Sequence, residues 1–584
     1  MIGLISATAA GATARDRLAA AWPARTRVYD GSVADAGSAG SAGSAGSAGS
    51  AGSVGDAVRR AFVECDQLVC FLATGAVVRL VAPLLADKRT DPGVVCVDEA
   101  GRFAVSLVGG HGGGANELAR EVGELLGAEP VVTTATDAVG MPGLDTLGLP
   151  VEGDVAGVTR ALLDGEPVGL DVESAWPLPA LPLAAEGACT VRVTDRAVEP
   201  AEHLVILRPP SLVVGVGASK GAPVDEVLGL VEDALRDAGL SARSVAELAT
   251  VDAKAEEPGI VGAAERLGVP LVTYTAGELA AVDVPNPSDA PLTAVGTPSV
   301  AEAAALVRGG ELLVPKRKSA RADGQPAMAT VAVVRRAARG RLAVVGLGPG
   351  ARDLLTPRAR DELRRASVLV GLDQYVDQIR DLLRPGTRIL ESGLGAEEER
   401  ARTAVSEARR GQAVALIGSG DAGVYAMASP ALAEASDDID VVGVPGVTAA
   451  LAAAAILGAP LGHDHVSISL SDLHTPWEVI ERRVRAAAEA DIVVTFYNPR
   501  SRGRDWQLPK ALAILSGHRE PTTPVGVVRN ASRPDESGRV TTLAGLDPAT
   551  VDMMTVVTVG NTATREIAGR MVTPRGYRWQ EEPK

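Results

Sequence analysis

The sequence predicts a multidomain α/β protein with mostly parallel sheets, and three observations lead to this prediction. The 584 residues suffice for three to five domains. The composition is 46% hydrophobic but only 3% aromatic, which predicts α/β layers with cores of valine, leucine and alanine. Short apolar runs alternate with helical segments, a pattern typical of parallel sheets that bind ligands at the carboxyl ends of their strands.

Strands and one helix are expected early in the chain. The apolar runs 67–73, 93–98 and 103–108 predict buried strands. Asn116 is expected to cap a helix over 117–126.

Two segments are typical of linkers. Residues 37–53 read GSAGSAGSAGSAGSAGS, which can bury nothing and predicts a flexible tract. The proline-rich segment 174–187 predicts a connector. New apolar runs at 211–217 and 341–346 then begin a second and a third α/β unit.

The third unit contains two clear helix starts. A threonine followed by proline, at Thr356-Pro357 and at Thr475-Pro476, is typical of a cap and the first helical residue. The strands expected in this unit cover 341–346, 413–417, 439–445, 466–470, 491–497, 524–528 and 554–559.

Charge and cysteine usage exclude several classes of protein. The net charge of −16 argues against nucleic acid as a partner, because phosphate binding needs a basic face. The four cysteines form no CxxC pair, so we expect no metal site, no disulfide framework and a cytoplasmic location. The first residues lack the basic region of a signal peptide, and the alanine-rich run 448–462 is too short and too weakly apolar to span a membrane.

A glycine-rich loop raises the question of the ligand. Gly418, Gly420 and Gly423 have the G-x-G-x-x-G spacing of dinucleotide sites. Asp421 lies inside the loop, where a carboxylate would repel a diphosphate by roughly 1 kcal/mol or more. The same carboxylate suits a ribose or a sulfonium cation, and S-adenosylmethionine carries both without a phosphate. A structural alternative is that Asp421 caps a helix starting at Ala422.

A second glycine loop lies at 346–350. The next helix is expected only at Thr356-Pro357, so its amino end does not point into this loop, which weakens a phosphate-binding interpretation. An NAD-dependent oxidoreductase remains the alternative that one dinucleotide loop would imply.

Six blocks follow one another in the last third of the chain: LAVVGLGPG (342–350), ALIGSGDAGVYAMA (415–428), VPGVTAALAAAAILGAPLGHD (444–464), ISLSDLHTPWEVIERR (468–483), FYNPRSRGR (496–504) and TPRGY (573–577). Together they resemble the tetrapyrrole methyltransferases, above all those of cobalamin synthesis that methylate precorrin-3B at ring carbon 17. The resemblance covers roughly 342–584. It implies the class III methyltransferase fold, two α/β domains with S-adenosylmethionine in the cleft between them, and a homodimer.

The resemblance also implies particular residues. The implied cofactor contacts are Gly348, Pro349, Gly420, Asp421, Tyr425, Thr448, Ala449, Tyr497, Asn498, Asn530 and Thr558. The implied reaction couples methyl transfer to contraction of the macrocycle, which needs proton handling. His463, Asp464 and Asp472 lie in matching motifs and are candidates for that role, with capping or hydrogen-bonded loop residues as the alternative.

The densest polar cluster of the first half surrounds His111, in the run LVGGHGGGANEL at 107–118. Backbone N–H groups in such a turn attract an anion, and a histidine is easily poised as an acid or base near neutral pH. The run VVTTATD at 131–137 adds hydroxyls and an acid downstream. The alternative is a spacer histidine with one hydrogen bond.

Several blocks of this half resemble the cobalt-precorrin-5A hydrolase of cobalamin synthesis: ATGAVVRLVAPLL (73–85), KRTDPGVVCVDEAGRFAVSLVGGHGGGANELA (88–119), VVTTATD (131–137), VVGVGASKGAP (213–223), ELATVDAKAEEPG (247–259) and TPSVAEAAALV (297–307). The resemblance covers about 1–338 and implies opening of a ring lactone with loss of a two-carbon fragment. We expect His111, with Asp98, Glu117 or Asp137 near it, to activate water. The glycine-rich N–H groups would stabilise the oxyanion.

The sequence therefore predicts a bifunctional enzyme of cobalamin synthesis that acts on small precorrins or cobalt-precorrins, with other enzymes of the pathway as potential partners. Whether the substrate contains cobalt stays open, and so does an inactive, corrinoid-binding first half. We expect α/β hydrolase-like cobalamin-synthesis domains first: an N-terminal α/β segment over residues 1–57 with the tract 37–53, a central hydrolase domain 58–155, a connector 156–210 and a C-terminal hydrolase domain 211–338. We expect a methyltransferase over 341–584, with subdomains of about 341–450 and 451–584, to follow.

Overall fold

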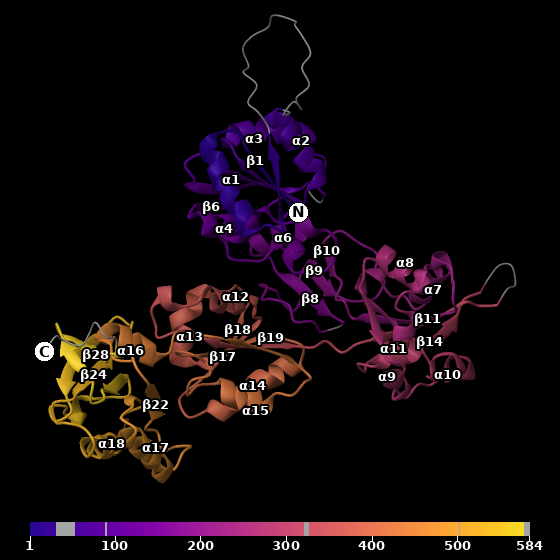
Figure 1. Cartoon of the computed structure of the whole chain (residues 1–584). Helices are drawn as coiled ribbons and strands as arrows, with labels where there is room; N and C mark the ends of the chain where they lie inside the picture. Colours follow the sequence, from indigo (N-terminus) through magenta and orange to yellow (C-terminus); the bar gives the residue numbers. More distant parts are fainter. Residues whose placement is uncertain (31–52, 88–89, 174, 321–325, 502, 577–584) are drawn as a thin grey trace, which may run out of the picture. The chain divides into compact units, whose positions relative to one another are not determined.

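The computed structural model describes residues 1–30, 53–87, 90–173, 175–320, 326–501 and 503–576 (Figure 1). The chain forms two compact units. The first comprises Met1–Ser174 with Leu181–Ala337, and the second Ala175–Ala180 with Ala338–Lys584. Residues 37–52 of the predicted flexible tract lie outside the described residues.

The first unit begins with a six-stranded sheet of order β2-β1-β3-β4-β5-β6 (Figure 1). Its strands are β1 (Ile2–Ser6), β2 (Thr26–Asp30), β3 (Gln67–Phe71), β4 (Gly93–Val97), β5 (Phe103–Val108) and β6 (Glu129–Val131). Its main helices are α1 (Ala9–Ala21), α2 (Val54–Glu64), α3 (Thr74–Val81) and α4 (Ala115–Leu126). The strands β3, β4 and β5 lie where the sequence predicts them.

The strand β5 reverses the direction of this sheet. β1 to β4 run parallel, but β5 is antiparallel to β4 because the turn at 98–102 is too short for a crossover. The loop after β5 therefore lies at the amino ends of the parallel strands. We expected ligands at the carboxyl ends of the strands, so this loop lies at the opposite end of the sheet from the one expected.

The predicted connector is itself folded. It contributes α6 (Val155–Leu163) and strands of a second sheet, of order β7-β10-β9-β8. These strands are β7 (Val151–Gly153), β8 (Val168–Val172), β9 (Cys189–Val193) and β10 (Leu204–Leu207). Burial alternates along β9, as expected for a strand with one face toward a core, and α6 contacts β8, β9 and β10.

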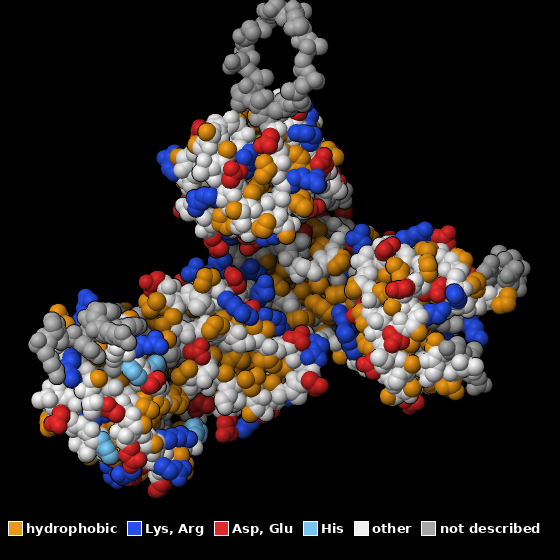
Figure 2. All heavy atoms as spheres, viewed as in Figure 1, with side chains coloured by type: hydrophobic (Ala, Val, Ile, Leu, Met, Phe, Trp, Pro, Cys, Tyr) orange, Lys and Arg blue, Asp and Glu red, His pale blue; other side chains and the backbone are white. Residues whose placement is uncertain are grey.

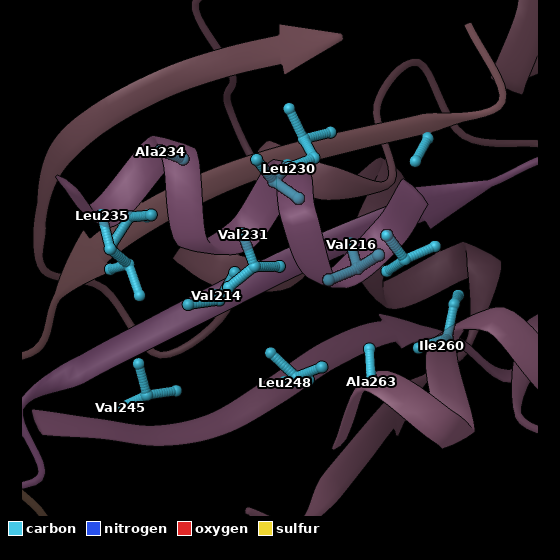
Figure 3. Packing of buried hydrophobic residues seen from close by; sticks show 14 of the residues in the cluster. Val214, Val216, Leu230, Val231, Ala234, Leu235, Val245, Leu248, Ile260 and Ala263 are labelled. Carbon is cyan, nitrogen blue, oxygen red and sulfur yellow. The ribbon is translucent and has the colours of Figure 1, made fainter. Parts of the chain in front are cut away.

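A third sheet of order β13-β12-β11-β15-β14 completes the first unit. Its strands are β11 (Leu212–Ala218), β12 (Val245–Val251), β13 (Leu271–Tyr274), β14 (Glu311–Lys318) and β15 (Ala329–Arg335). Figure 3 shows valines and leucines of this sheet packed against residues of α7 (Val224–Asp237) and α8 (Pro258–Leu267). The core is aliphatic, as the low aromatic content predicts.

A buried ion pair joins the second and third sheets of the first unit. Arg335 Nε and Nη2 each donate to Asp195 at 2.6 Å, and Ser211 Oγ donates to the same carboxylate at 2.7 Å. Asp195 is only 1% exposed. Burial alone would raise the pKa of Asp195, but the hydrogen bonds from Arg335 and Ser211 outweigh it and hold that pKa below its ordinary value.

We expect Arg335→Ala to lower the free energy of unfolding of the first unit by about 3 kcal/mol or more, because it leaves a buried carboxylate unpaired. The folded-state pKa of Asp195 is depressed. The stabilisation is therefore present above the unfolded pKa of about 4 and is lost as the pH falls through the folded-state pKa. Urea unfolding between pH 3 and pH 7 measures both effects. Glu311→Ala is the control, since Glu311 pairs with the same arginine but is 67% exposed; an equal loss in both variants would contradict the prediction.

The second unit has two halves, and the first is built on a parallel sheet of order β18-β17-β19-β16-β20. Its strands are β16 (Arg341–Gly346), β17 (Val368–Leu372), β18 (Arg388–Ser392), β19 (Ala413–Gly418) and β20 (Asp440–Val444). Helices α12 (Pro357–Arg365) and α13 (Asp373–Ile379) cover one face, while α14 (Glu397–Arg409) and α15 (Ala428–Glu434) cover the other (Figure 1). Both faces are buried, which explains the continuous apolar runs.

The other half holds a mixed sheet of order β22-β23-β26-β24-β25. Its strands are β22 (His465–Ser469), β23 (Val493–Tyr497), β24 (Pro524–Arg529), β25 (Ser537–Thr542) and β26 (Thr555–Val559). Helices α17 (Trp477–Glu489) and α18 (Gln507–Ser516) pack on one face and α16 (Ala449–Leu457) on the other. The prediction of mostly parallel sheets fails here. The short loop between β24 and β25 allows only antiparallel pairing, and β26 is antiparallel to both β23 and β24.

Two surface properties are relevant to the choice of partner. On the face that Figure 2 shows, lysine and arginine side chains are mixed with aspartate and glutamate side chains. No helix in the described part of the chain is both long enough and apolar enough to cross a membrane.

Candidate active sites

The two glycine loops of the second unit are joined by backbone hydrogen bonds. Gly348 N donates to Gly420 O at 3.0 Å, and Gly420 N donates to Gly348 O at 2.7 Å. Both glycines have left-handed φ, +73° and +71°. A Cβ on Gly446, in the loop after β20, would lie 2.1 Å from Gly420 O. The loops after β16, β19 and β20 therefore meet at a point where no side chain fits.

Asp421 also connects these loops through hydrogen bonds. Its carboxylate accepts the N–H of Gly423 at 2.8 Å and the N–H of Gly446 at 3.0 Å. No helix follows directly, since α15 begins only at Ala428, so the alternative that Asp421 caps a helix from Ala422 is wrong. Like the loop after β16, this loop does not lead straight into a helix amino terminus, the feature that binds diphosphates.

Two tyrosines link the halves of the second unit. Tyr497, at the end of β23, shares a hydrogen bond of 2.5 Å with the hydroxyl of Thr448 and accepts the N–H of Ala450 at 2.9 Å. Tyr425 donates to Ser467 O at 2.8 Å, and its ring centroid lies 5.3 Å from that of Tyr497. The structure thus brings the predicted residues Tyr425, Thr448, Ala449 and Tyr497 together beside the glycine loops.

We expect Tyr497→Phe to weaken cofactor binding about 5- to 10-fold without unfolding the protein, because it removes one hydroxyl that serves Thr448 and Ala450 N–H. Calorimetric titration of the variant and of the wild type with S-adenosylmethionine measures the affinity, and circular dichroism checks the folding. Unchanged affinity would show that the hydroxyl does not position the site.

The remaining predicted cofactor residues have different surroundings. Asn498 has φ +48°, and its amide donates to Ser469 Oγ at 3.2 Å. Asn530 has φ +52°, and its N–H donates to Met554 O at 3.0 Å. Thr558 is 1% exposed inside the sheet, where its hydroxyl lies 3.2 Å from that of Thr495. Thr558 is therefore a buried residue of the sheet and not part of a loop.

Sequence reasoning missed Arg533. Its Nε donates to Pro349 O at 2.9 Å, and its Nη2 donates to Ser419 Oγ at 3.3 Å. The guanidinium thus contacts both glycine loops from the other half of the unit. The sequence gives no local signal for a contact between residues 184 positions apart.

The proposed acid–base residues of this unit do not form one group. His463 and Asp464 precede β22, whereas the glycine loops and Tyr497 lie at the carboxyl end of the neighbouring strand, so the structure places them at opposite ends of the sheet. His463 Nδ1 accepts the N–H of Asp464 at 2.7 Å. Asp472 follows β22 and accepts from Gln507 at 3.0 Å. Of the three candidates, only Asp472 lies at the end that carries the loops.

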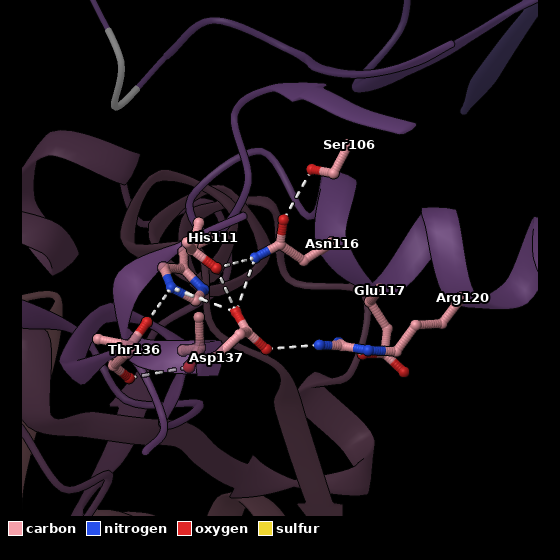
Figure 4. Close-up of polar contacts among 10 residues, drawn as sticks. Ser106, His111, Asn116, Glu117, Arg120, Thr136 and Asp137 are labelled. Carbon is pink, nitrogen blue, oxygen red and sulfur yellow. Dashed lines mark hydrogen bonds and ion pairs between the residues drawn. The ribbon is translucent and has the colours of Figure 1, made fainter. Parts of the chain in front are cut away.

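In the first unit, the predicted residues His111 and Asp137 do meet (Figure 4). His111 Nε2 lies 2.7 Å from Thr136 Oγ1 and 3.8 Å from Asp137 Oδ2. Asp137 also accepts from Asn116 at 2.9 Å and pairs with Arg120. Asn116 is not the helix cap that we predicted. Gly114 takes that position, and the buried Asn116 side chain orients Asp137 instead.

Asp137 is held as a carboxylate. Burial alone would raise its pKa, but hydrogen bonds from Thr134 and Arg120 and the charge of Arg120 lower the pKa below its ordinary value. The Thr136 hydroxyl and this carboxylate both lie on the Nε2 side of the His111 ring, where they orient the ring.

The other two acids are not members of this group. Asp98 lies at the opposite end of β5 from His111, and its carboxylate accepts the N–H groups of Arg102 and Phe103, each at 2.7 Å. Glu117 is 71% exposed and pairs with Arg120. The hairpin turn carries Asp98 away from His111, whereas Glu117 is linked to the cluster only through Arg120, which also pairs with Asp137.

Two hollows adjoin His111. One, of about 560 Å³, is lined by the glycine loop and by acids that include Glu64, Asp66 and Asp91. The other, of about 360 Å³, is lined by Thr136 and by residues of α6 that include Arg160. Among the described residues, no cluster of three or more histidine, cysteine or acidic side chains is arranged to hold a metal ion.

The fold and joined loops of the second unit are those of a two-domain α/β methyltransferase, and residues 341–547 match the family of tetrapyrrole (corrin/porphyrin) methylases. Residues 56–137 match the cobalamin synthesis G N-terminal family and residues 212–334 the cobalamin synthesis G C-terminus family. The resemblances predicted from the sequence are confirmed for both units of the chain.

Individual relatives carry more specific names than the family. A probable cobalt-factor III C(17)-methyltransferase of Salmonella typhimurium is 46% identical over 239 residues, which is 40% of this chain and 99% of the relative. A precorrin-3B C(17)-methyltransferase of a Sinorhizobium species is 42% identical, covering 41% of this chain and 97% of the relative. The crystal structure of the methyltransferase CobJ shares 40% identity, covering 40% of this chain and all of that chain at a TM-score of 0.39.

The second unit belongs to the family of C(17)-methyltransferases of cobalamin synthesis. Joined to the cobalamin synthesis G domains, it makes the chain a bifunctional enzyme of that pathway. The predicted α/β fold class, with its class III methyltransferase domains, is confirmed.

Proposed function

We propose that the second unit transfers a methyl group from S-adenosylmethionine to ring carbon 17 of precorrin-3B or its cobalt form, with contraction of the ring. Tetrapyrrole methylases use this donor, and the relatives are named for this position of the ring. The observation that carries the choice of donor is Asp421 at the junction of two loops that lack a directly following helix. That arrangement suits a sulfonium and a ribose and disfavours a diphosphate.

The residues at the junction fit such a donor. The left-handed glycines Gly348 and Gly420 let a ligand approach the backbone, and Tyr425 exposes 54% of its surface beside them. These residues, with Pro349, Thr448, Ala449, Tyr497 and Asn498, would hold the donor, which supplies an electrophilic methyl group when bound. The chain's task is alignment of donor and acceptor, which can contribute about 7–11 kcal/mol.

Calorimetric titration of the whole protein with S-adenosylmethionine, S-adenosylhomocysteine and NAD tests the donor. We expect the first two to bind and NAD not to bind. Mass spectrometry of products from cobalt-free and cobalt-loaded precursors then identifies the substrate form. Binding of NAD alone would overturn the proposal.

We propose a second activity for the first unit, hydrolytic opening of a precorrin lactone. The observation that favours it is His111 held by Thr136 and by the ionised Asp137, beside glycine-rich backbone N–H groups. The imidazole of His111 would accept a proton from water, and the N–H groups would stabilise the oxyanion. Release of a two-carbon product from a lactone-containing cobalt-precorrin distinguishes this activity from an inactive, corrinoid-binding domain.

The proposed partners follow from this function. The substrate is a small polycarboxylate, and we propose that the protein works in the cytoplasm as a homodimer, in contact with other enzymes of the pathway. Sedimentation of the purified chain tests the dimer.

A further inference from the structure

Arg533 joins the halves of the methyltransferase unit at the glycine loops. It lies in the loop after β24 in the second half, and it contacts Pro349 O at 2.9 Å and Ser419 Oγ at 3.3 Å in the first half. Pro349 and Ser419 adjoin Gly348 and Gly420, the two residues that bridge the loops. One guanidinium therefore contacts both loops on either side of their junction.

The first loop is shaped to receive this side chain. Gly350 has φ +145°, and a Cβ there would lie only 2.7 Å from Arg533 Cγ. Any larger residue at this position would strain the backbone and displace the arginine. The glycine of the loop is thus matched to Arg533 as well as to a tight turn.

The loop that carries Arg533 is held in a strained form. Seven non-glycine residues of the described chain have left-handed φ, and two of them, Asn530 and Ser532, lie within three residues of Arg533. Two others, Tyr425 and Asn498, lie in the loops after β19 and β23. Arg533 N donates to Asn530 O at 2.9 Å, and Ser532 N donates to Glu536 at 2.6 Å, so hydrogen bonds within the loop hold the turn. Strained residues of this kind gather where geometry must be fixed for function.

Arg533 differs from the neighbouring Arg529 in its partners. Among the described residues, no carboxylate lies within 4.0 Å of its guanidinium, in contrast to Arg529 on the preceding strand, which pairs with Asp552 at 2.7 Å. The hydrogen bonds of Arg533 therefore serve the loops and not a surface ion pair.

We propose that Arg533 is a positioning residue for methyl transfer, a latch that holds the two glycine loops in their cofactor-binding form from the opposite half of the unit. The inference rests on the proposed S-adenosylmethionine site. The latch sets how well the loops are preorganised, so it acts on donor binding and alignment without contacting the reacting atoms.

Arg533→Ala in the full chain tests the latch. We expect the dissociation constant and the KM for S-adenosylmethionine to rise about 10- to 100-fold, with a smaller change in kcat, and Arg533→Lys to recover some of the affinity. Arg529→Ala is the matched control, since it removes a neighbouring exposed arginine, and it should leave both constants unchanged.

A second measurement needs no ligand. Without the latch, the amide hydrogens of Gly348 and Gly420 should exchange faster in Arg533→Ala, while those of the central strands β16 and β19 stay protected. Failure of the wild type to bind the donor would overturn the proposed cofactor, but the exchange experiment would still test the latch. Unchanged exchange at both glycines, or unchanged affinity in a variant whose wild type binds, overturns the inference.

A double-mutant cycle separates the latch from general damage. Gly350→Ala should displace the arginine and reproduce the loss of Arg533→Ala, and the double variant should be no worse than the more affected single variant. Additive losses would mean that the two residues act independently, which contradicts the latch.

Discussion

Replacing Asp421 by alanine is expected to reduce methyl transfer at least 100-fold. The carboxylate accepts two backbone N–H groups, from Gly423 and Gly446, that belong to different loops. Each charge-assisted hydrogen bond contributes about 1.5–3 kcal/mol, so the loss of both weakens the contact between the loops. The substitution also removes the negative charge that favours a sulfonium. Initial rates with S-adenosylmethionine, together with its dissociation constant, measure the effect.

The asparagine variant refines the test. Asp421→Asn keeps an acceptor oxygen for one N–H but presents an amide donor to the other, so we expect an intermediate loss of about 10-fold. Asp438→Ala removes an exposed carboxylate that pairs with Arg409 in the same half, and it should leave the rate unchanged. A normal rate in Asp421→Ala would mean that neither the junction nor the charge contributes to the reaction.

Much of the fold follows from patterns of short range. The apolar runs at 103–108 and 341–346 form β5 and β16 as predicted, and Thr356 caps a helix that begins at Pro357. These predictions succeed because burial on one or both faces of a strand, and the chemistry of a helix start, are fixed by neighbouring residues.

Features that depend on sheet direction were not predictable in the same way. His463 and Tyr497 lie at opposite ends of the parallel strands β22 and β23, although both belong to motifs of one family. The sequence distance between them contains no information on which end of a strand each occupies. The alternative of a helix start at Ala422 fails for a related reason, since the Asp421 carboxylate accepts the N–H groups of Gly423 and of the distant Gly446.

The reversal of β5 moves the predicted site of the first unit. Because β5 is antiparallel to β4, His111 lies at the amino ends of the parallel strands, where Gln67 of β3 donates to Gly113 O and Gly114 O at 3.2 and 3.1 Å. The structure brings His111 and Asp137 of the predicted cluster together, but at the opposite end of the sheet from the one expected for ligands.

The His111 cluster leads to the second large expected effect. His111→Ala should reduce lactone opening about 1,000-fold, within the range of roughly 100- to 10,000-fold that a general acid or base contributes. The reason is that no other described histidine lies among the residues of the His111 hollows, so no second base is at hand. Release of the two-carbon product from a lactone-containing cobalt-precorrin measures the rate.

Matched variants distinguish a catalytic His111 from a structural one. His203→Ala removes an exposed histidine of the same unit, and Asp98→Asn changes an acid at the other end of β5, so both should keep the activity. Asp137→Asn keeps the shape of the cluster but removes the negative charge near Nε2 of His111. The imidazolium formed when His111 accepts a proton then lacks a stabilising carboxylate, so the rate should fall by about 10-fold or more. Methyl transfer by the second unit should be normal in all four variants, because it depends on the separate glycine loops. If His111→Ala opened the lactone at the normal rate, the histidine would be a spacer in the glycine turn, and the backbone N–H groups alone would have to account for the site.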